Sequence, residues 1–251
     1  MPASTRRWCA SSAEPLRTVF ASLKTTMTLN RRNFSAMVVG GGLTGLLAPA
    51  AAQPAVVEGV NYVKLAQPAP VADRSKIEVV EFFWYECPHC STFEPALEAW
   101  VQKLPPDVSF RRVPVWFRDE PFTTQQRLYY AIETLGLVPT LHRRVFYAIH
   151  NERERLRTPE DIAAFVTKHG VDPVKFMAAY SSFTVQTRAQ QARQLGAAYK
   201  IDAVPAMGVQ GRYYTTGTLA SAGGPPPSAG GANERMLGVV DALIVKARQG
   251  S

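Results

Sequence analysis

The 251-residue chain is poor in the side chains that hold metals, with three cysteines and four histidines. Cys9 lies in the N-terminal leader, so the body of the chain holds one cysteine pair, Cys87 and Cys90, and no other thiol. The histidines outside this pair's motif are His142, His150 and His169. A structural zinc site needs about four ligands, and none of these histidines stands at ligand spacing from the pair. The composition therefore argues against a zinc site.

The chain also lacks a long hydrophobic run. The apolar stretch from Ala36 to Leu47 contains four glycines and is shorter than the ~20 residues of a membrane helix. The net charge of +8 comes mostly from residues 1–52, and the remainder holds 22 basic and 19 acidic groups. That balance is typical of an ordinary soluble surface, so no nucleic-acid partner is expected. A 46% hydrophobic content is enough for one or two folded domains and excludes wholesale disorder.

Residues 1–52 are predicted to be a cleavable signal peptide. Arg31 and Arg32 form a positive segment, the apolar stretch follows, and residues 48–52 provide small side chains for cleavage after Ala52. The adjacent arginines also resemble a twin-arginine signal, so Sec-type and twin-arginine export both remain open. A signal peptide of ordinary length begins at Met27, which makes Met27 the expected true start. Export would place the cysteine pair where disulfides persist.

The body of the chain begins with alternating strand and helix patterns. A short edge strand is predicted around Asn61 to Leu65, and a strand buried on both faces from Ile77 to Trp84. The helix that follows has an apolar stripe and is expected to end at the Pro105-Pro106 pair. Val108 to Trp116 alternates, and Pro114 within it indicates a strand with an edge-like or bulged segment.

The middle of the chain has helical periodicity and hardly a strand-like run. Four or five helical stretches are predicted between Glu120 and Ala198, and Thr158 and Asp172, each followed by proline, are predicted helix caps. Strand character then returns as a hairpin, from Ala206 to Gln210 and from Arg212 to Thr215. A Gly/Pro/Ser loop over residues 220–232 and an amphipathic helix close the chain.

This order predicts an α/β fold with an inserted all-helical subdomain. The α/β domain is expected to be discontinuous, with residues 53–118 and 199–251 on either side of a helical insertion at residues 119–198. The fold class by itself assigns no chemistry.

Cys87-Pro88-His89-Cys90 lies between the buried strand and the first turn of the next helix. A thiolate at a helix N-terminus faces unpaired backbone N–H groups and the positive end of the helix dipole, so the pKa of Cys87 is predicted to fall below ~8.5. Pro88 suits the first helical position, and Cys90 lies on the same turn, within disulfide reach. His89 adds a group that stabilises the thiolate further. A stabilised thiolate leaves readily, which makes the disulfide oxidising.

A lone CxxC pair has other interpretations. Haem attachment would need a histidine at position 91, where the chain has Ser91. A purely structural disulfide around so short a loop would restrain little of the unfolded chain. We therefore predict a redox-active pair that needs neither cofactor nor metal.

Two segments resemble the DsbA family of periplasmic disulfide oxidants: EFFWYECPHC from Glu81 to Cys90, and AVPAM from Ala203 to Met207. The resemblance extends from Val56 to Arg248 and implies a thioredoxin-like fold with a helical insertion. It implies an enzyme, a protein disulfide oxidoreductase, that acts as a monomer and donates its disulfide to reduced, unfolded exported proteins. Reoxidation by a membrane protein similar to DsbB is implied as well.

The resemblance also assigns roles to single residues. Cys87 is expected to be the exposed nucleophile and Cys90 its more buried resolving partner. Pro205 is expected to be cis, which turns the backbone of Val204 outward to pair with an extended substrate. Glu81 is expected to be a buried carboxyl below the active site that assists proton movement and has a raised pKa.

This chain can be compared with the family at three further positions. Val204 matches the oxidant branch, whereas the isomerase branch usually has threonine there. Arg112 lies where related proteins place a basic partner for the buried acid. Pro114 replaces a histidine often found nearby, so the fine tuning of the redox potential is not carried over.

Two other functions remain open at this point. A disulfide isomerase or reductase of the same fold would carry an N-terminal dimerisation domain, for which residues 53–86 leave little room. A protein that uses the cysteine pair to bind copper or zinc would retain metal through purification.

Overall fold

A computed structural model describes residues 56–225 and 231–250. The chain divides into two units, Met1–Ala48 and Pro49–Ser251, and the described residues all belong to the second. The predicted signal peptide, the start at Met27 and Cys9 lie outside the described residues.

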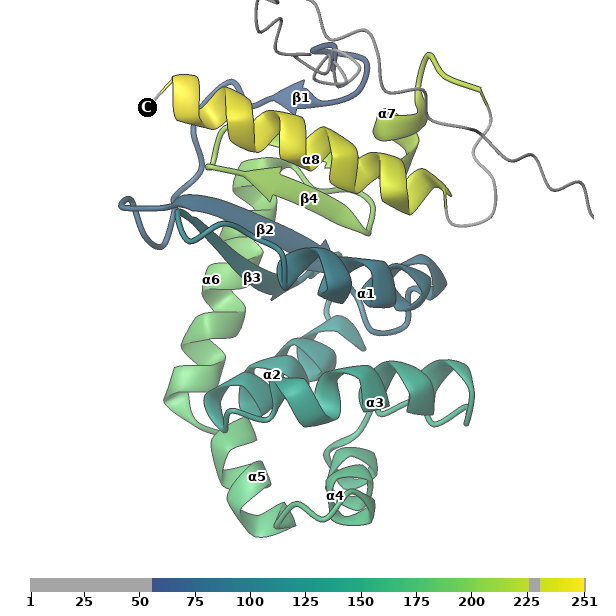
Figure 1. The fold of residues 1–251 in the computed structure, drawn as a ribbon. Helices are drawn as coiled ribbons and strands as arrows, with labels where there is room; N and C mark the ends of the chain where they lie inside the picture. The colour runs from purple at the N-terminus through teal and green to yellow at the C-terminus, as the bar shows by residue number, and fades with distance from the viewer. Residues whose placement is uncertain (1–55, 226–230, 251) are drawn as a thin grey trace, which may run out of the picture. The chain divides into compact units, whose positions relative to one another are not determined.

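A five-stranded mixed sheet lies at the centre of the second unit (Figure 1). Its strands are β1 (Val63–Lys64), β2 (Ile77–Phe83), β3 (Val108–Pro114), β4 (Ala206–Val209) and β5 (Tyr213–Thr216), in the order β1-β5-β4-β2-β3. β2 pairs parallel to β3 and antiparallel to β4. Every residue of β2 is buried, as predicted for a strand covered on both faces. β3 is an edge strand, which accommodates Pro114.

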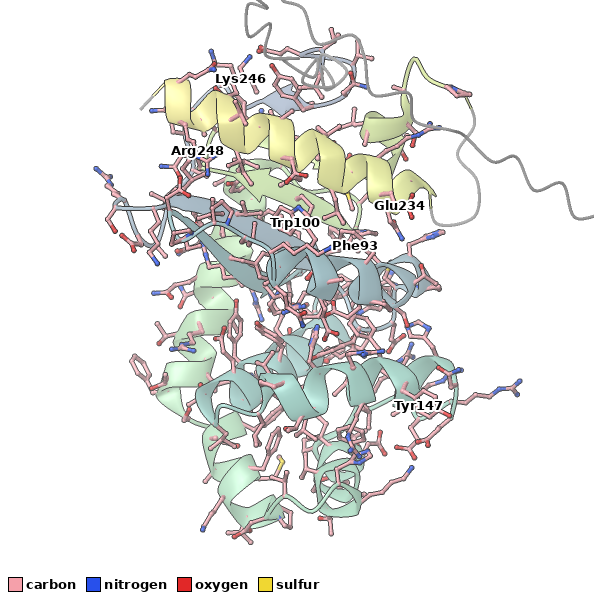
Figure 2. All side chains as sticks on the ribbon, viewed as in Figure 1. Phe93, Trp100, Tyr147, Glu234, Lys246 and Arg248 are labelled. Carbon is pink, nitrogen blue, oxygen red and sulfur yellow. The ribbon has the colours of Figure 1, made fainter. Side chains whose placement is uncertain are left out.

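Helices α1 (Pro88–Val101) and α8 (Gly231–Gln249) cover one face of the sheet. Figure 2 shows Phe93 and Trp100 of α1 on the side of the sheet that α8 covers. Trp100 Nε1 donates to Asp241 Oδ1 of α8 at 2.9 Å, and Phe93 joins the apolar cluster that both helices form with the sheet. Helix α1 is therefore held in place both by the sheet and by α8.

Two predicted boundaries were wrong. α1 ends at Val101, before Pro105-Pro106, because the chain leaves the helix in tight turns in which the N–H groups of Lys103 and Leu104 each bond a carbonyl three residues back. The predicted 220–232 loop is shorter than expected. α7 (Gly217–Ser221) enters its first part, with Thr216 Oγ1 accepting from the Leu219 N–H, and α8 begins at Gly231. Residues 226–230 lie outside the described residues.

Five helices form the predicted helical insertion. They are α2 (Phe122–Thr134), α3 (Val138–His150), α4 (Pro159–Lys168), α5 (Pro173–Tyr180) and α6 (Phe183–Tyr199). Both predicted caps are present, since Thr158 forms a capping box with Asp161 and Asp172 accepts from the Val174 N–H at 2.9 Å. Helices α2 to α5 lie on the side of α1 opposite α8 (Figure 1). No helix of the described residues is both long enough and apolar enough to cross a bilayer.

The end of α6 packs against the other face of the sheet. The ring of Tyr199 meets that of Phe82 edge to face, with centroids 5.0 Å apart, and its hydroxyl accepts from the Gly211 N–H at 3.0 Å. The predicted β4–β5 hairpin turns at Gln210 and Gly211, whose φ angles of 52° and 62° suit a type I′ turn. Gly208 of β4 lies directly beneath the Tyr199 ring, where an added Cβ would come within 2.5 Å of it.

Gly208→Ala is expected to destabilise the protein by about 1–3 kcal/mol, because the added methyl group overlaps the Tyr199 ring in a closely packed core. Gly196→Ala in α6 is the matched control, since nothing beyond its own helix lies within 4 Å of the methyl group that alanine would add, and alanine favours a helix by ~0.5–1 kcal/mol. Urea unfolding measures both changes. Equal stabilities for the two variants would contradict this account of the packing.

Candidate active site

The junction of β2 and α1 places Cys87 at the start of a helix. Cys87 is the N-cap of α1, with φ −80° and ψ 115°, and Pro88 occupies the first turn. The Cys87 N–H donates to the Trp84 carbonyl at 3.0 Å, and the Ser91 N–H donates to the Cys87 carbonyl at 3.1 Å. No side chain caps this helix end. The first N–H groups of α1 are therefore left to interact with the Cys87 sulfur.

Both thiols are buried, although the sequence predicted an exposed Cys87. Cys87 is 7% exposed and Cys90 0%, so the order of exposure is as predicted, but the expectation of an exposed Cys87 was wrong. The cause is the loop before β4, where the Val204–Pro205 peptide bond is cis and the Val204 carbonyl oxygen lies 3.4 Å from Cys87 Sγ. The predicted cis proline thus adjoins the sulfur. Pro88 and His89 are exposed beside it.

The two thiols have opposite acidities. Hydrogen bonding from the Cys90 thiol, with further bonds from the backbone N–H groups of Cys90 and His89, lowers the pKa of Cys87 to about 6 against the opposing effect of burial. The charge of His89 acts in the same direction. Burial, together with the neighbouring Cys87, raises the pKa of Cys90 well above its usual value. The position of Cys87 at a helix end correctly predicted that its pKa is lowered. The contribution of the Cys90 thiol was not predicted.

A buried polar network lies beneath the cysteines. Glu81 of β2 is completely buried, and its Oε2 lies 3.3 Å from Arg112 Nε of β3. Arg112 also pairs with Glu94 of α1. Glu94 Oε2 in turn lies 3.4 Å from His142 Nε2 of α3, whose Nδ1 is 2.8 Å from the Tyr85 hydroxyl. The predicted pairing of Glu81 with Arg112 is therefore present, within a larger set of groups.

The network holds two carboxyl groups and one guanidinium. Burial raises the pKa of Glu81 well above its usual value, the charge of Glu94 adds to this, and Arg112 offsets part of it. Burial acts on Glu94 in the same sense, but hydrogen bonds and charges from His142 and Arg112 outweigh it and lower the pKa of Glu94. Burial lowers the pKa of His142. The network therefore holds an Arg112–Glu94 ion pair beside two groups, the Glu81 carboxyl and the His142 imidazole, whose burial favours their neutral forms.

Sequence reasoning missed Glu94 and His142. Glu94 lies four residues after Cys90, so helical periodicity places it on the buried side of α1 with Leu97. That signal was present in the sequence. His142 lies beside the buried Leu141 in α3, and no local feature of the chain distinguishes it from a histidine packed in the core.

Arg112→Met is expected to lower the free energy of unfolding by roughly 3–5 kcal/mol, because it leaves the Glu94 charge buried without its cation. Arg143→Gln is the matched control. Arg143 pairs with Glu98 at 3.5 Å, but its side chain is 62% exposed, and such surface pairs contribute ~1 kcal/mol or less. Urea unfolding at pH 7 compares the variants, and a loss as small for Arg112→Met as for Arg143→Gln would contradict the buried ion pair.

Comparison with known proteins identifies the family. The model of the DSBA-like thioredoxin domain matches residues 78–223. The thiol:disulfide interchange protein DsbA of Azotobacter vinelandii is 45% identical over 190 residues, which cover 76% of this chain and 84% of the relative. DsbA of Pseudomonas aeruginosa is 40% identical over 214 residues, which cover 85% of this chain and 95% of the relative.

Solved structures agree in fold as well as in sequence. The crystal structure of Pseudomonas aeruginosa DsbA aligns with a TM-score of 0.70 and 40% identity, covering 76% of this chain and 94% of that one. The oxidoreductase DsbA from Xylella fastidiosa aligns with a TM-score of 0.67 and 31% identity, covering 77% and 98%. The predicted thioredoxin-like fold with a helical insertion is confirmed. The chain belongs to the DsbA family of thiol:disulfide oxidoreductases.

Proposed function

We propose that this protein introduces disulfide bonds into exported proteins by donating the Cys87–Cys90 disulfide. The observation that carries the proposal is the opposite acidity of the two thiols, with the pKa of Cys87 lowered to about 6 and that of Cys90 raised. In thiol–disulfide exchange a sulfur of low pKa leaves fastest. Reduction of the pair creates a stabilised thiolate at Cys87, and this stabilisation drives electrons from the substrate to the enzyme.

The first exchange begins when a substrate thiolate attacks Cys87 Sγ, which is the less buried sulfur. A substrate–Cys87 bond forms, the Cys87–Cys90 bond breaks, and its electron pair passes to Cys90. Cys90 takes up a proton because its pKa is high. Glu81, whose pKa is raised by burial and whose charge acts on Cys90, is the proposed proton donor, and Arg112 sets its charge environment.

The second exchange releases the product. A second substrate thiolate attacks the substrate sulfur of the mixed disulfide, and Cys87 leaves as a thiolate. The substrate has then lost two electrons, and the cysteine pair has gained them. Val204 is proposed to hold an extended substrate through its backbone, with Pro205 setting the direction of that backbone, since the Val204 carbonyl already lies beside Cys87 Sγ.

The setting of this reaction is also a proposal. Residues 1–52 would direct export to the periplasm by the Sec or the twin-arginine route. A membrane oxidase similar to DsbB would reoxidise the pair, and the protein would act as a monomer without a cofactor. Residues 119–198 would form a separate helical subdomain that covers the active site carried by residues 53–118 and 199–251.

Equilibration of the purified protein with glutathione tests the direction of electron flow. We expect the pair to stay reduced at glutathione ratios that oxidise a reducing thioredoxin, because the reduced form contains the stabilised thiolate. A potential close to that of reducing thioredoxins would overturn the oxidant assignment and favour a reductase of the same fold.

Substitution of single cysteines tests the division of roles. Cys87→Ser is expected to abolish oxidation of a reduced test protein. Cys90→Ala is expected to accumulate mixed disulfides with proteins that contain disulfides, because Cys87 can still attack such a bond but no Cys90 thiol remains to displace the bound sulfur. Non-reducing electrophoresis and mass spectrometry detect such adducts. Adducts through Cys90 in the Cys87→Ser variant, with none in Cys90→Ala, would reverse the assignment.

A further inference from the structure

The residue before the nucleophile carries a charge that the reaction above does not use. Glu86 directly precedes Cys87, and its side chain is 13% exposed. The Cα atoms of neighbouring residues are about 3.8 Å apart, and the reach of the two side chains adds to this, so the Glu86 carboxylate and the Cys87 sulfur are separated by roughly one Debye length, ~10 Å, at most. A negative charge at that range raises the pKa of a thiol. Glu86 by itself therefore opposes formation of the Cys87 thiolate.

Arg157 provides the compensating charge. Its Nε donates to Glu86 Oε1 at 2.7 Å, and its Nη2 pairs with Oε2, so guanidinium and carboxylate meet through two parallel bonds. This geometry is the strong form of the arginine–carboxylate pair. Gln125, which is buried, donates from Nε2 to the same Oε1 at 2.9 Å. Both partners of Glu86 come from the helical insertion.

The start of α4 holds Arg157 in place. The N–H groups of Arg157 and Thr158 both donate to Asp161 Oδ2 at 3.3 Å, and the Asp161 N–H donates back to Thr158 Oγ1 at 3.1 Å. Next to Arg157, Leu156 is buried in the apolar core. The backbone of Arg157 is therefore anchored, although the Arg157 side chain is 40% exposed.

We propose that Arg157 is a positioning residue for disulfide exchange, which cancels the charge of Glu86 and holds that carboxylate against the insertion so that Cys87 is stored as a thiolate. The inference rests on the proposed role of Cys87 as the nucleophile. It gives the helical insertion a part in tuning the reaction, in addition to covering the site.

Ultraviolet titration of the thiolate in reduced variants tests the proposal. Arg157→Gln removes the positive charge and is expected to raise the pKa of Cys87 by about 0.5 to 1 unit. Glu86→Gln, whose amide oxygen still accepts from Gln125, is expected to lower it. The double variant is expected to return close to the parent value, because both charges are gone. Lys168→Gln, which removes a lysine paired with Glu152 and Glu154 at the far end of α4, is expected to leave the value unchanged.

The outcomes separate this inference from the proposed function. A parent protein whose thiol titrates near the free value of ~8.5 would contradict the role of Cys87 itself. A parent near 6 with no rise in Arg157→Gln would overturn only the role of Arg157. If the double variant keeps the full shift of Arg157→Gln, the effect is structural and the inference is also overturned. Circular dichroism of each variant confirms folding, and the Glu86→Gln arm decides the question if Arg157→Gln does not fold.

Discussion

The chemistry depends on one interaction, a sulfur anion held at the N-terminus of α1 by a neighbouring thiol and by backbone N–H groups. The surrounding fold is what keeps those donors in place. β2 is buried along its whole length and delivers the chain to the helix start, and Pro88 occupies the first turn. α8 and the sheet fix the helix from the other side through Trp100 and Phe93. Because these elements are preorganised, the thiolate is stabilised without rearrangement during exchange.

Opposite environments for two adjacent sulfurs follow from this arrangement. Cys87 gains hydrogen bonds as an anion, whereas Cys90 is completely buried, which disfavours its anion. In the network beneath, the Arg112 cation pairs with the Glu94 anion. A second balanced pair, Glu86 with Arg157, lies beside Cys87. In both pairs the arginine offsets the negative charge of a carboxylate near the thiolate.

The sequence was most informative where the signal is local. The apolar run of β2, the caps at Thr158 and Asp172, the β4–β5 hairpin and the cysteine motif at a helix start are all encoded within a few residues, and each was found. The end of α1 and the short helix α7 were missed because they depend on tight turns and on one cap residue.

Contacts between elements were the hardest to predict. Glu94 meets His142, and Glu86 meets Arg157 across 71 residues of chain, only because the insertion folds back onto α1. The burial of Cys87 has the same origin, since the Val204–Pro205 loop reaches it from a distant part of the chain.

Comparing the stability of the two redox states tests the central claim most directly. The thiolate exists only in the reduced protein, and its pKa is lower in the folded chain, about 6, than in the unfolded one, ~8.5. A lowered folded pKa contributes stability that is fully present above the unfolded value and is lost as the pH falls through the folded value. Urea unfolding from about pH 5 to 9 should therefore show the reduced form gaining stability relative to the oxidised form between about pH 6 and 8.5, and being the more stable of the two at about pH 8.5. An oxidised form that is the more stable across this range would contradict the account.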